Sequence, residues 1–380
     1  MRVLNLEHDL CLATEEMNFI PPKAVVEFAR RCRWVERFMR APEGYGYAVM
    51  PWGWNLQLRE RLLKEGVPEG ELPAQVELEF IKEYSRREFA QQLLEFLSGI
   101  PRIISSCSFR DCILTADSWS CDNSIAGDSI LEIISPGYRI VAHSLQEIDG
   151  FLQEKGKVVL KSPLSGSGKG VRFVTGEMME TDRGWCRRTL ESQGTVIVEE
   201  RLDVVQEFAM LFEAGDSGIK FLGYSMFYAY NGAYMGNMLA SNGYLEEKLV
   251  EVAANAISRG SASRVETEIF GKPGICVSRK TLEEIRKKVA GFLQERLCGR
   301  YSGFLGVDMF LFRDGEGRIM VNPAVEINLR MTMGLIARNI FDYHREEFQL
   351  GEGTHCFEPE RGIFPAGDII YRYGYNGKWD

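Results

Sequence analysis

Apolar and polar positions along the chain change between the periods of strands and of helices. In the first hundred residues, apolar runs at 2–6 and 47–50 have strand character, and helical spacing of apolar residues predicts helices over 22–40 and 56–65. Strands that alternate with helices favour a small α/β domain with a parallel sheet. We therefore expect an N-terminal α/β domain over 1–104, followed by a Ser-, Cys- and Asp-rich connection over 105–137.

The pattern changes after residue 137. Strands are predicted over 139–142, 157–161 and 195–199, and a helix over 145–155. A second helix, over 281–297, carries a single apolar stripe and has Ser278 or Thr281 available as its cap. The apolar runs 306–312 and 320–330 flank a Gly-containing turn at 314–317, which predicts two adjacent antiparallel strands.

Two polar motifs directly follow the N-terminal strands. They are Glu7-His8-Asp9 and the segment Trp52–Asn55. In open α/β sheets, ligands bind beyond the carboxyl ends of the strands, so both motifs are placed where a ligand can bind. A role as turn and cap residues is the alternative that the sequence leaves open.

Composition narrows the classes of partner and of chemistry. The chain has 380 residues, 45% of them hydrophobic and 26% charged, as expected for a soluble globular protein of two or three domains. A net charge of −9 argues against nucleic acid or an anionic membrane surface as the main partner. The polar N-terminus predicts a cytoplasmic protein. Nine cysteines without a Cys-x-x-Cys pair, and only four histidines, indicate free thiols and argue against zinc.

The first motif with chemical character is a strand that ends in lysine. Lys161 closes an apolar run and precedes a Ser/Gly loop, made of Ser165, Gly166, Ser167, Gly168, Lys169 and Gly170. Glycines let backbone N–H groups approach phosphate oxygens, and lysine adds a positive charge. The loop is neither a Walker A motif, because Pro163 and Gly170 occupy key positions, nor a dinucleotide fingerprint, because Val171 replaces the third glycine. A plain hairpin turn is the alternative.

The second motif is an apolar strand that ends in two carboxylates, Glu199 and Glu200. It is followed by Leu202 and Glu207. Backbone that leaves a strand can pair with adenine, and a nearby carboxylate can accept hydrogen bonds from ribose hydroxyls. The alternative is a solvated strand end.

The third motif places polar residues inside the predicted strand pair. Asp308 lies on one strand, and Glu326, Asn328 and Arg330 alternate with apolar residues on the other, so these three share a face. Carboxylate and amide oxygens are ligands for Mg²⁺, and arginine suits a phosphate or an acyl phosphate. A structural salt bridge of Arg330 with Glu326 or Asp308 is the alternative.

Together, and in this order, the three motifs resemble the ATP-grasp superfamily over roughly residues 138–340. The resemblance implies α/β plus α+β architecture: two α+β subdomains, over 138–205 and 206–380, that grip ATP behind a small Rossmann-like N-terminal domain. The N-terminal part resembles a group of bacterial ATP-grasp proteins, which names no substrate.

The resemblance also implies a role for each site residue. Lys161 would contact the phosphates of ATP under the loop 165–170, and the catalytic residues would be Arg330 and Lys169. Glu199, Glu200 and Leu202 would lie around adenine, with Glu207 at the ribose. Asp308, Glu326 and Asn328 would bind one or two Mg²⁺ ions, with Mn²⁺ as the other candidate.

One feature departs from the family pattern. The family usually carries a further lysine upstream of the glycine loop, and here Arg139 is the only basic residue between Arg110 and Lys155. We expect Arg139 to contact phosphate in its place. A surface arginine paired with an acid such as Glu132 is the alternative.

The expected function is that of an ADP-forming ligase, which activates a carboxylate as an acyl phosphate and joins it to an amine. An ATP-grasp kinase that phosphorylates a small-molecule hydroxyl is the catalytic alternative, and a non-catalytic ATP-binding protein is the other. The expected partners are a small-molecule carboxylate and an amine, with a homodimer as the candidate assembly.

Overall fold

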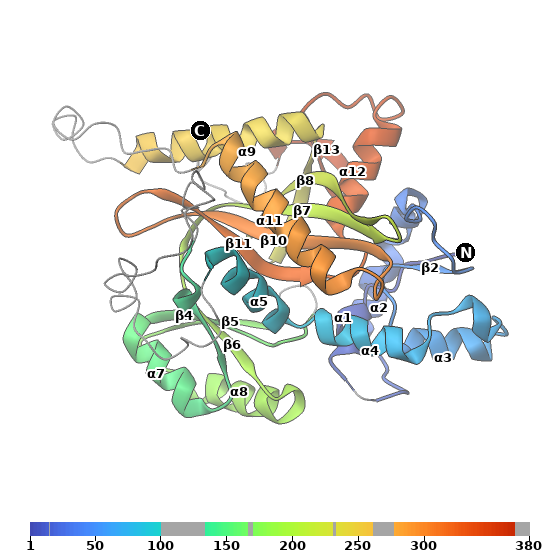
Figure 1. The fold of residues 1–380 in the computed structure, drawn as a ribbon, viewed down its shortest axis with the longest axis horizontal. Helices are drawn as coiled ribbons and strands as arrows, with labels where there is room; N and C mark the ends of the chain where they lie inside the picture. The colour runs from blue at the N-terminus through green and yellow to red at the C-terminus, as the bar shows by residue number, and fades with distance from the viewer. Residues whose placement is uncertain (15, 100–133, 166–169, 231–232, 261–276, 369–380) are drawn as a thin grey trace, which may run out of the picture.

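The computed structural model describes residues 1–380 apart from 15, 100–133, 166–169, 231–232, 261–276 and 369–380. Its strands form a short parallel pair, a four-stranded antiparallel sheet and a seven-stranded antiparallel sheet (Figure 1). Most of the predicted connection, residues 105–133, lies outside the described residues.

The N-terminal segment is mostly helical. It has one parallel pair, β1 (Arg2–Val3) and β2 (Met50–Pro51), and the helices α1 (His8–Leu12), α2 (Lys23–Arg31), η1 (Arg33–Phe38), α3 (Leu56–Lys64), η2 (Glu69–Glu71), α4 (Gln75–Tyr84) and α5 (Arg87–Ser98). The predicted parallel pairing and the predicted helices are present, the first of them divided into α2 and η1. The Rossmann-like domain is not confirmed, because the sheet described within residues 1–104 has only two strands of two residues.

The apolar residues of this segment are buried against the C-terminal half of the chain. Phe38 and Trp52 share a core with Leu211 of the large sheet. On the other side, α5 packs on α11 (Arg279–Leu297), where the rings of Phe89 and Phe292 lie 5.2 Å apart. The N-terminal segment therefore covers the large sheet, which supplies the core that two short strands cannot form alone.

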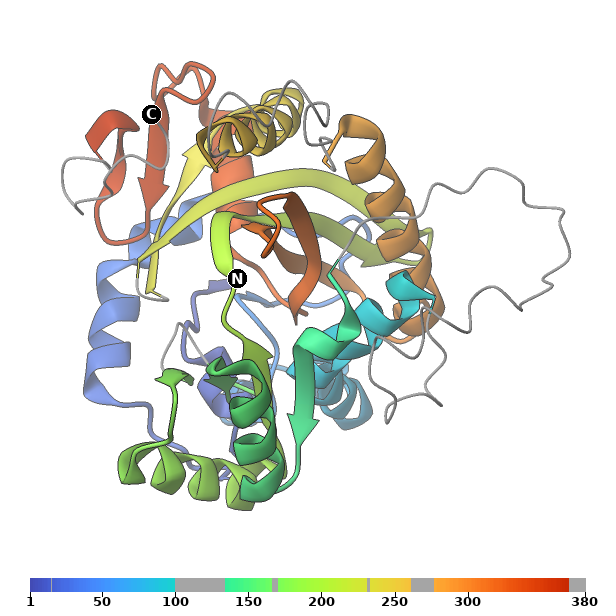
Figure 2. The same cartoon turned by 90° about the vertical axis from the view of Figure 1, so that its left-hand side faces the viewer.

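The small sheet and its two helices form one α+β unit. Strands β3 (Arg139–Ala142), β4 (Lys157–Lys161), β5 (Val171–Thr175) and β6 (Val196–Glu200) lie in the order β3-β6-β4-β5. Helices α7 (Leu145–Lys155) and α8 (Glu180–Gln193) cover the side away from the large sheet (Figures 1 and 2). α7 ends at Gly156, whose left-handed φ of 71° turns the chain into β4. The predicted helix 145–155 and strand 157–161 are thus confirmed.

The large sheet forms the second α+β unit. It contains β7 (Asp203–Gly215), β8 (Gly218–Tyr230), β9 (Ala233–Leu239), β10 (Gly303–Arg313), β11 (Ile319–Asn328), β12 (His355–Glu358) and β13 (Gly362–Pro365), in the order β11-β10-β7-β8-β9-β12-β13. Its further helices are α9 (Asn242–Gly260), α11 and α12 (Met333–His344), and η5 (Pro136–Tyr138) precedes β3. The predicted strand pair 306–312 and 320–330 is confirmed as β10 and β11, joined by a turn in which Gly317 has a φ of 80°.

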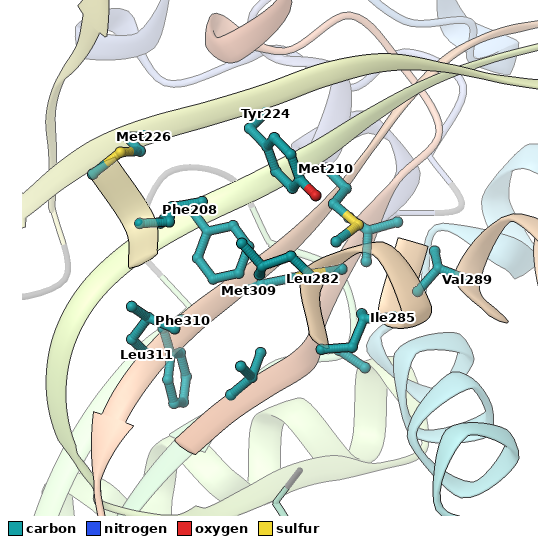
Figure 3. Close-up of a cluster of buried hydrophobic side chains, with 14 of the residues drawn as sticks. Phe208, Met210, Tyr224, Met226, Leu282, Ile285, Val289, Met309, Phe310 and Leu311 are labelled. Carbon is teal, nitrogen blue, oxygen red and sulfur yellow. The ribbon is translucent and has the colours of Figure 1, made fainter. Parts of the chain in front are cut away.

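Alternation along β7 explains why this sheet is covered on both faces. Phe208 and Met210 point into the core under α9 and α11, which Figure 3 shows together with Tyr224 and Ile285. Leu211, one position further, points into the opposite core with α12 and the N-terminal segment. Successive side chains of a strand face opposite sides, so a strand that is apolar throughout needs two cores.

The helix predicted over 281–297 begins two residues earlier in the structure, at the position that its cap sets. Ser278 accepts a hydrogen bond from Thr281 N, so Ser278 is the cap and α11 begins at Arg279. The described cysteines are free thiols, as predicted: Cys11, Cys32, Cys186, Cys298 and Cys356. Among the helices described, none has the length and apolar character needed to cross a membrane.

Candidate active site

The carboxylate of Glu199 lies between two basic side chains of the small sheet. Arg139, its cross-strand neighbour on β3, donates from Nε to Oε1 at 2.8 Å, and Nζ of Lys161 lies 2.6 Å from Oε2. Burial opposes ionisation of Glu199, but Arg139 and Lys161 outweigh it and hold its pKa below the ordinary value. The network fixes Lys161 at the end of β4, where the Ser/Gly loop begins.

Arg139 is not the surface arginine that the sequence left as an alternative. Its side chain is fully buried, and its Nη2 donates to the carbonyl of Val325 on β11 at 2.9 Å. Its Nη1 is also buried and has no hydrogen-bond partner in the part of the chain that the structure describes. Arg139 thus links the small sheet to the large one and keeps one donor unused.

A backbone hydrogen bond joins the two ends of the Ser/Gly loop, Ser162 and Gly170, which form its neck. Ser162 N donates to the carbonyl of Gly170 at 2.9 Å. A Cβ at Gly170 would meet Ser165 Oγ at 2.4 Å and Ser162 Oγ at 2.7 Å, so this position requires glycine. The loop tip, with the predicted residues Gly166, Ser167, Gly168 and Lys169, lies outside the described residues.

The residues predicted around the nucleoside follow the loop on β6 and β7. Glu200 Oε2 lies 3.6 Å from Lys155 Nζ, and Leu202 is half-buried in the link between these strands. Glu207 lies on β7, where burial raises its pKa to about 7 and the charge of Lys161 opposes the rise. Lys161 on one sheet and Glu207 on the other are therefore within electrostatic reach.

Asp308 and Glu326 face each other as cross-strand partners on β10 and β11. Asn328 donates from Nδ2 to Asp308 Oδ2 at 3.0 Å, which leaves its amide oxygen able to accept. Burial raises the pKa of Asp308 to about 7, Glu326 adds to the rise, and Arg330 opposes it. A divalent cation would relieve this repulsion between two carboxylates.

The donor set fits Mg²⁺ better than a softer metal. Within the described ranges, no group of three or more His, Cys, Asp or Glu side chains could hold a metal ion. The set is therefore two carboxylates, Asp308 and Glu326, with the amide oxygen of Asn328. Such hard oxygen ligands suit Mg²⁺, which keeps several waters and does not need an all-protein cage.

Arg330 has a different partner from those that the sequence suggested. Both oxygens of Asp9 accept from its guanidinium, at 2.8 Å each, so its direct ion pair is neither with Glu326 nor with Asp308. Asp9 belongs to the motif at 7–9 and sits in the first turn of α1. The bidentate contact fixes the plane of the guanidinium next to Asp308 and Glu326, which we call the metal pair.

Arg87 is the site residue that sequence reasoning missed. It opens α5, and its guanidinium donates to the carbonyl of Ser162, to Ser165 Oγ at 2.9 Å and to Glu326 Oε2 at 2.9 Å. It therefore ties the neck of the loop to the metal pair. No local pattern marks it, because its partners lie 75 to 239 positions away.

The second N-terminal motif divides between two roles. Asn55 is a cap residue, since its side chain accepts from Leu58 N at 2.8 Å. Trp52 instead lies beside the site: its carbonyl accepts from Met331 N at 2.8 Å, and the residue lines the cavity next to Asp308 and Glu326.

That cavity has a volume of about 360 Å³ and begins at the metal pair. Its charged lining comes from Asp9, Arg87, Asp308, Glu326, Arg330, Glu358 and Glu360. Its apolar lining includes Leu6, Phe28, Trp52, Ala209, Phe227 and Met333. Of the residues predicted around the nucleotide, Ser165 at the start of the loop lines it, whereas Lys161, Glu199, Glu200, Leu202 and Glu207 do not. The cavity is thus room for a second ligand beside the metal pair.

No family model matches the sequence, and no curated protein matches it. Solved structures do match. N5-carboxyaminoimidazole synthetase from Staphylococcus aureus, complexed with ADP, aligns at 14% identity and a TM-score of 0.38, over 74% of this chain and 53% of that chain. D-alanyl-alanine synthetase A from Vibrio cholerae aligns at 13% identity and a TM-score of 0.29, over 52% of this chain and 49% of that chain.

The biotin carboxylase domain of 2-oxoglutarate carboxylase from Hydrogenobacter thermophilus, in complex with MgADP, ADP and bicarbonate, aligns at 11% identity and a TM-score of 0.42, over 85% of this chain and 58% of that chain. These three structures are of ATP-grasp enzymes. This chain spans about half the length of the first of them. Because the TM-scores are below 0.5, its function has to be argued from its own residues.

Glu207 should make stability depend on pH. A glutamate ionises near pH 4.5 in the unfolded chain but near pH 7 in this fold, so the folded state loses stability as the pH rises between these values. Glutamine carries no charge, so nucleotide-free Glu207→Gln should exceed wild type by on the order of 3 kcal/mol at pH 8 and match it at pH 4. Urea denaturation at both pH values measures this.

The exposed Glu191→Gln on α8 is the matched control for the same chemical change, and it should show no such difference. If Glu207→Gln is less stable than wild type at pH 8, the ionised carboxylate of Glu207 does not destabilise the fold, and the prediction is wrong.

The pair of Asp9 and Arg330 predicts non-additive effects on stability. Asp9→Ala strands a largely buried guanidinium and should cost about 3 kcal/mol of unfolding free energy. Adding Arg330→Met removes that charge, so the double variant should be more stable than Asp9→Ala alone. Urea denaturation of the single and double variants measures the coupling; simple additivity would show that no direct pair exists.

Proposed function

We propose that the chain is a Mg-ATP-dependent, ADP-forming ligase that activates a carboxylate and joins it to an amine. One observation carries the proposal: a basic network on the small sheet meets an acidic, metal-suited pair on the large sheet. Arg139 connects Glu199 to Val325, and Arg87 connects the loop neck to Glu326. Such a junction places cations, a metal and a cavity where a polyphosphate and a second substrate can meet.

In this proposal the nucleotide lies between the two sheets. Lys161 and the unused donor of Arg139 bind phosphate oxygens, with Glu199 as the residue that positions both. Backbone N–H groups of the loop 165–170 cover the phosphates, and Lys169 acts on turnover. Glu200 and the backbone at Leu202 hold adenine, and Glu207 accepts from the ribose. The protonated fraction of Glu207 falls once a polar ligand replaces its apolar surroundings.

Asp308, Glu326 and Asn328 hold one or two Mg²⁺ ions in this scheme. The bound metal would neutralise phosphate charge and so ease attack on the γ-phosphorus. Arg330, oriented by Asp9, stabilises negative charge on the transferred phosphoryl group and on the incoming carboxylate.

The reaction follows from this arrangement. A carboxylate oxygen of the substrate attacks the γ-phosphorus of ATP, the bond from that phosphorus to the bridging oxygen breaks, and ADP leaves. A neutral amine then attacks the carbonyl carbon of the acyl phosphate, loses a proton, and inorganic phosphate leaves. The protein contributes positioning and charge stabilisation rather than a nucleophile of its own.

We further propose the division of the chain into an N-terminal part over 1–104, a connection over 105–137, a small subdomain over 138–205 and a large one over 206–380. The first of these contributes Asp9 and Arg87 to the site, so it acts with the large subdomain.

Lys161 should contribute to nucleotide affinity. Lys161→Ala removes a charge-assisted hydrogen bond to phosphate and should raise the dissociation constant of a non-hydrolysable ATP analogue roughly tenfold or more. Lys157→Ala is the matched control, because Lys157 is exposed at the other end of the same strand. Calorimetric titration decides, and equal affinities for the two variants would refute the assignment.

ADP release from Mg-ATP tests the reaction itself. Release should require both an organic acid and an amine from a metabolite panel, and Glu326→Gln should lower it at least a hundredfold when assayed at a temperature where the variant remains folded. A stable phosphorylated product that forms without an amine would instead identify a kinase. Nucleotide binding without turnover across the whole panel would exclude the ligase.

A further inference from the structure

The cavity beside the metal pair has a wall whose chemistry indicates what it binds. Apolar residues from four separate parts of the chain line it: Phe28, Trp52, Phe227 and Met333. The backbone of Trp52 is fixed on both sides, because its main-chain N–H donates to Val3 O and its carbonyl accepts from Met331 N, both at 2.8 Å, and its side chain is buried. The ring of Phe227 lies 6.4 Å from that of Tyr234. An ordered aromatic wall favours an apolar ligand surface.

The polar atoms beside Phe227 in this wall are already engaged with one another. Tyr234 donates its hydroxyl to Asn237 Oδ1, and Asn237 donates from Nδ2 to Ser225 Oγ at 2.6 Å and to Met226 O at 3.3 Å. Asn237 and Ser225 are both buried. A ligand with many hydroxyl groups would therefore find few open partners here and would lose its hydrogen bonds to water.

Gly334 lets the start of α12 pack closely against Ser225 on β8. A Cβ at this position would meet Ser225 Oγ at 2.5 Å and Ser225 Cβ at 2.8 Å, so the start of α12 can lie against β8 only with glycine there. The cavity is therefore bounded at this side by fixed, closely packed groups.

Charge differs between the two ends of the cavity. Arg87 and Arg330 lie beside the metal pair on β10 and β11, whereas Glu358 and Glu360 line the cavity at β12, on the other side of β7, β8 and β9 in the large sheet. Their partners Arg361 and Arg31 do not line the cavity, so the far end presents carboxylates to a ligand. One negative group is thus favoured near Arg330, and a second one at the far end is disfavoured.

We propose that the acid activated at this site is a monocarboxylic acid with an apolar, ring-sized body. This inference rests on the proposed ligase function, which places the carboxylate at the metal pair. A cavity of about 150 Å³ accommodates benzene, so about 360 Å³ is enough for a ring with a short chain and its carboxylate. Dicarboxylic acids are disfavoured by Glu358 and Glu360, and polyhydroxylated acids by a wall whose polar atoms already bond to one another.

Binding to the full-length protein tests the inference. In the presence of Mg²⁺ and a non-hydrolysable ATP analogue, calorimetry should show 3-phenylpropionate and hexanoate binding at least tenfold more tightly than acetate, succinate or gluconate. Equal or tighter binding of succinate or gluconate would overturn the inference, as would preference for 3-phenylpropylamine over 3-phenylpropionate.

Two variants locate the effect in the cavity. Phe227→Ala removes wall surface, and Met333→Glu adds a carboxylate at the first residue of α12, where the helix N-terminus favours a negative charge. Each should weaken 3-phenylpropionate binding tenfold or more and leave the affinity for the ATP analogue within twofold. Phe173→Ala, on the small sheet and half exposed, is the control and should change neither.

The proposed ligase function and the proposed cavity ligand can be refuted separately. If the ATP analogue does not bind, the proposed ligase function is wrong. If the analogue binds but Phe227→Ala and Met333→Glu bind 3-phenylpropionate like wild type, only the assignment of the cavity is wrong.

Discussion

The ionised carboxylate of Glu199 is the constraint on which much of this structure depends. Its side chain is only 4% exposed, and an uncompensated charge at that depth would be strongly destabilising. Arg139 and Lys161 compensate it from the two neighbouring strands of the small sheet. Because Arg139 also donates to Val325 of the large sheet, the same buried charge sets Lys161 in place and joins the two sheets at the site.

The large sheet shows the same relation between burial and charge over longer distances. Asp9 binds Arg330 from 321 positions away, and Arg87 binds Glu326 across 239. Each pair joins the N-terminal segment to β11 or to the residues directly after it. Breaking either pair would leave a charge in a poorly solvated place, so the N-terminal helices are held to the site by electrostatics as well as by their apolar contacts.

The site could be predicted where local rules place its residues. Asp308 and Glu326 were found because a short turn brings two strands together and alternation puts the polar residues of each strand on one face. That they lie directly opposite each other depends on a β-bulge between Asp308 and Phe310, which alternation does not predict. The partners of Arg139 and Arg330 were not found, since an arginine in a strand carries no mark of the acid that it will meet. Arg87 was missed for the same reason: its helical surroundings show only an ordinary amphipathic segment.

The sequence by itself determined the elements that depend on neighbouring residues. Helix α7 with its terminal Gly156, the lysine at the end of β4, the apolar stripe of α11 and the β10–β11 hairpin all follow from period, capping and turn chemistry. Only the tertiary structure decided that the N-terminal apolar residues cover the large sheet and that a cavity with an aromatic wall opens beside the metal pair. Such outcomes depend on which surfaces, far apart in the sequence, bury each other from water. The free energy of that burial is shared by several segments, so the local pattern of any one segment does not reveal it.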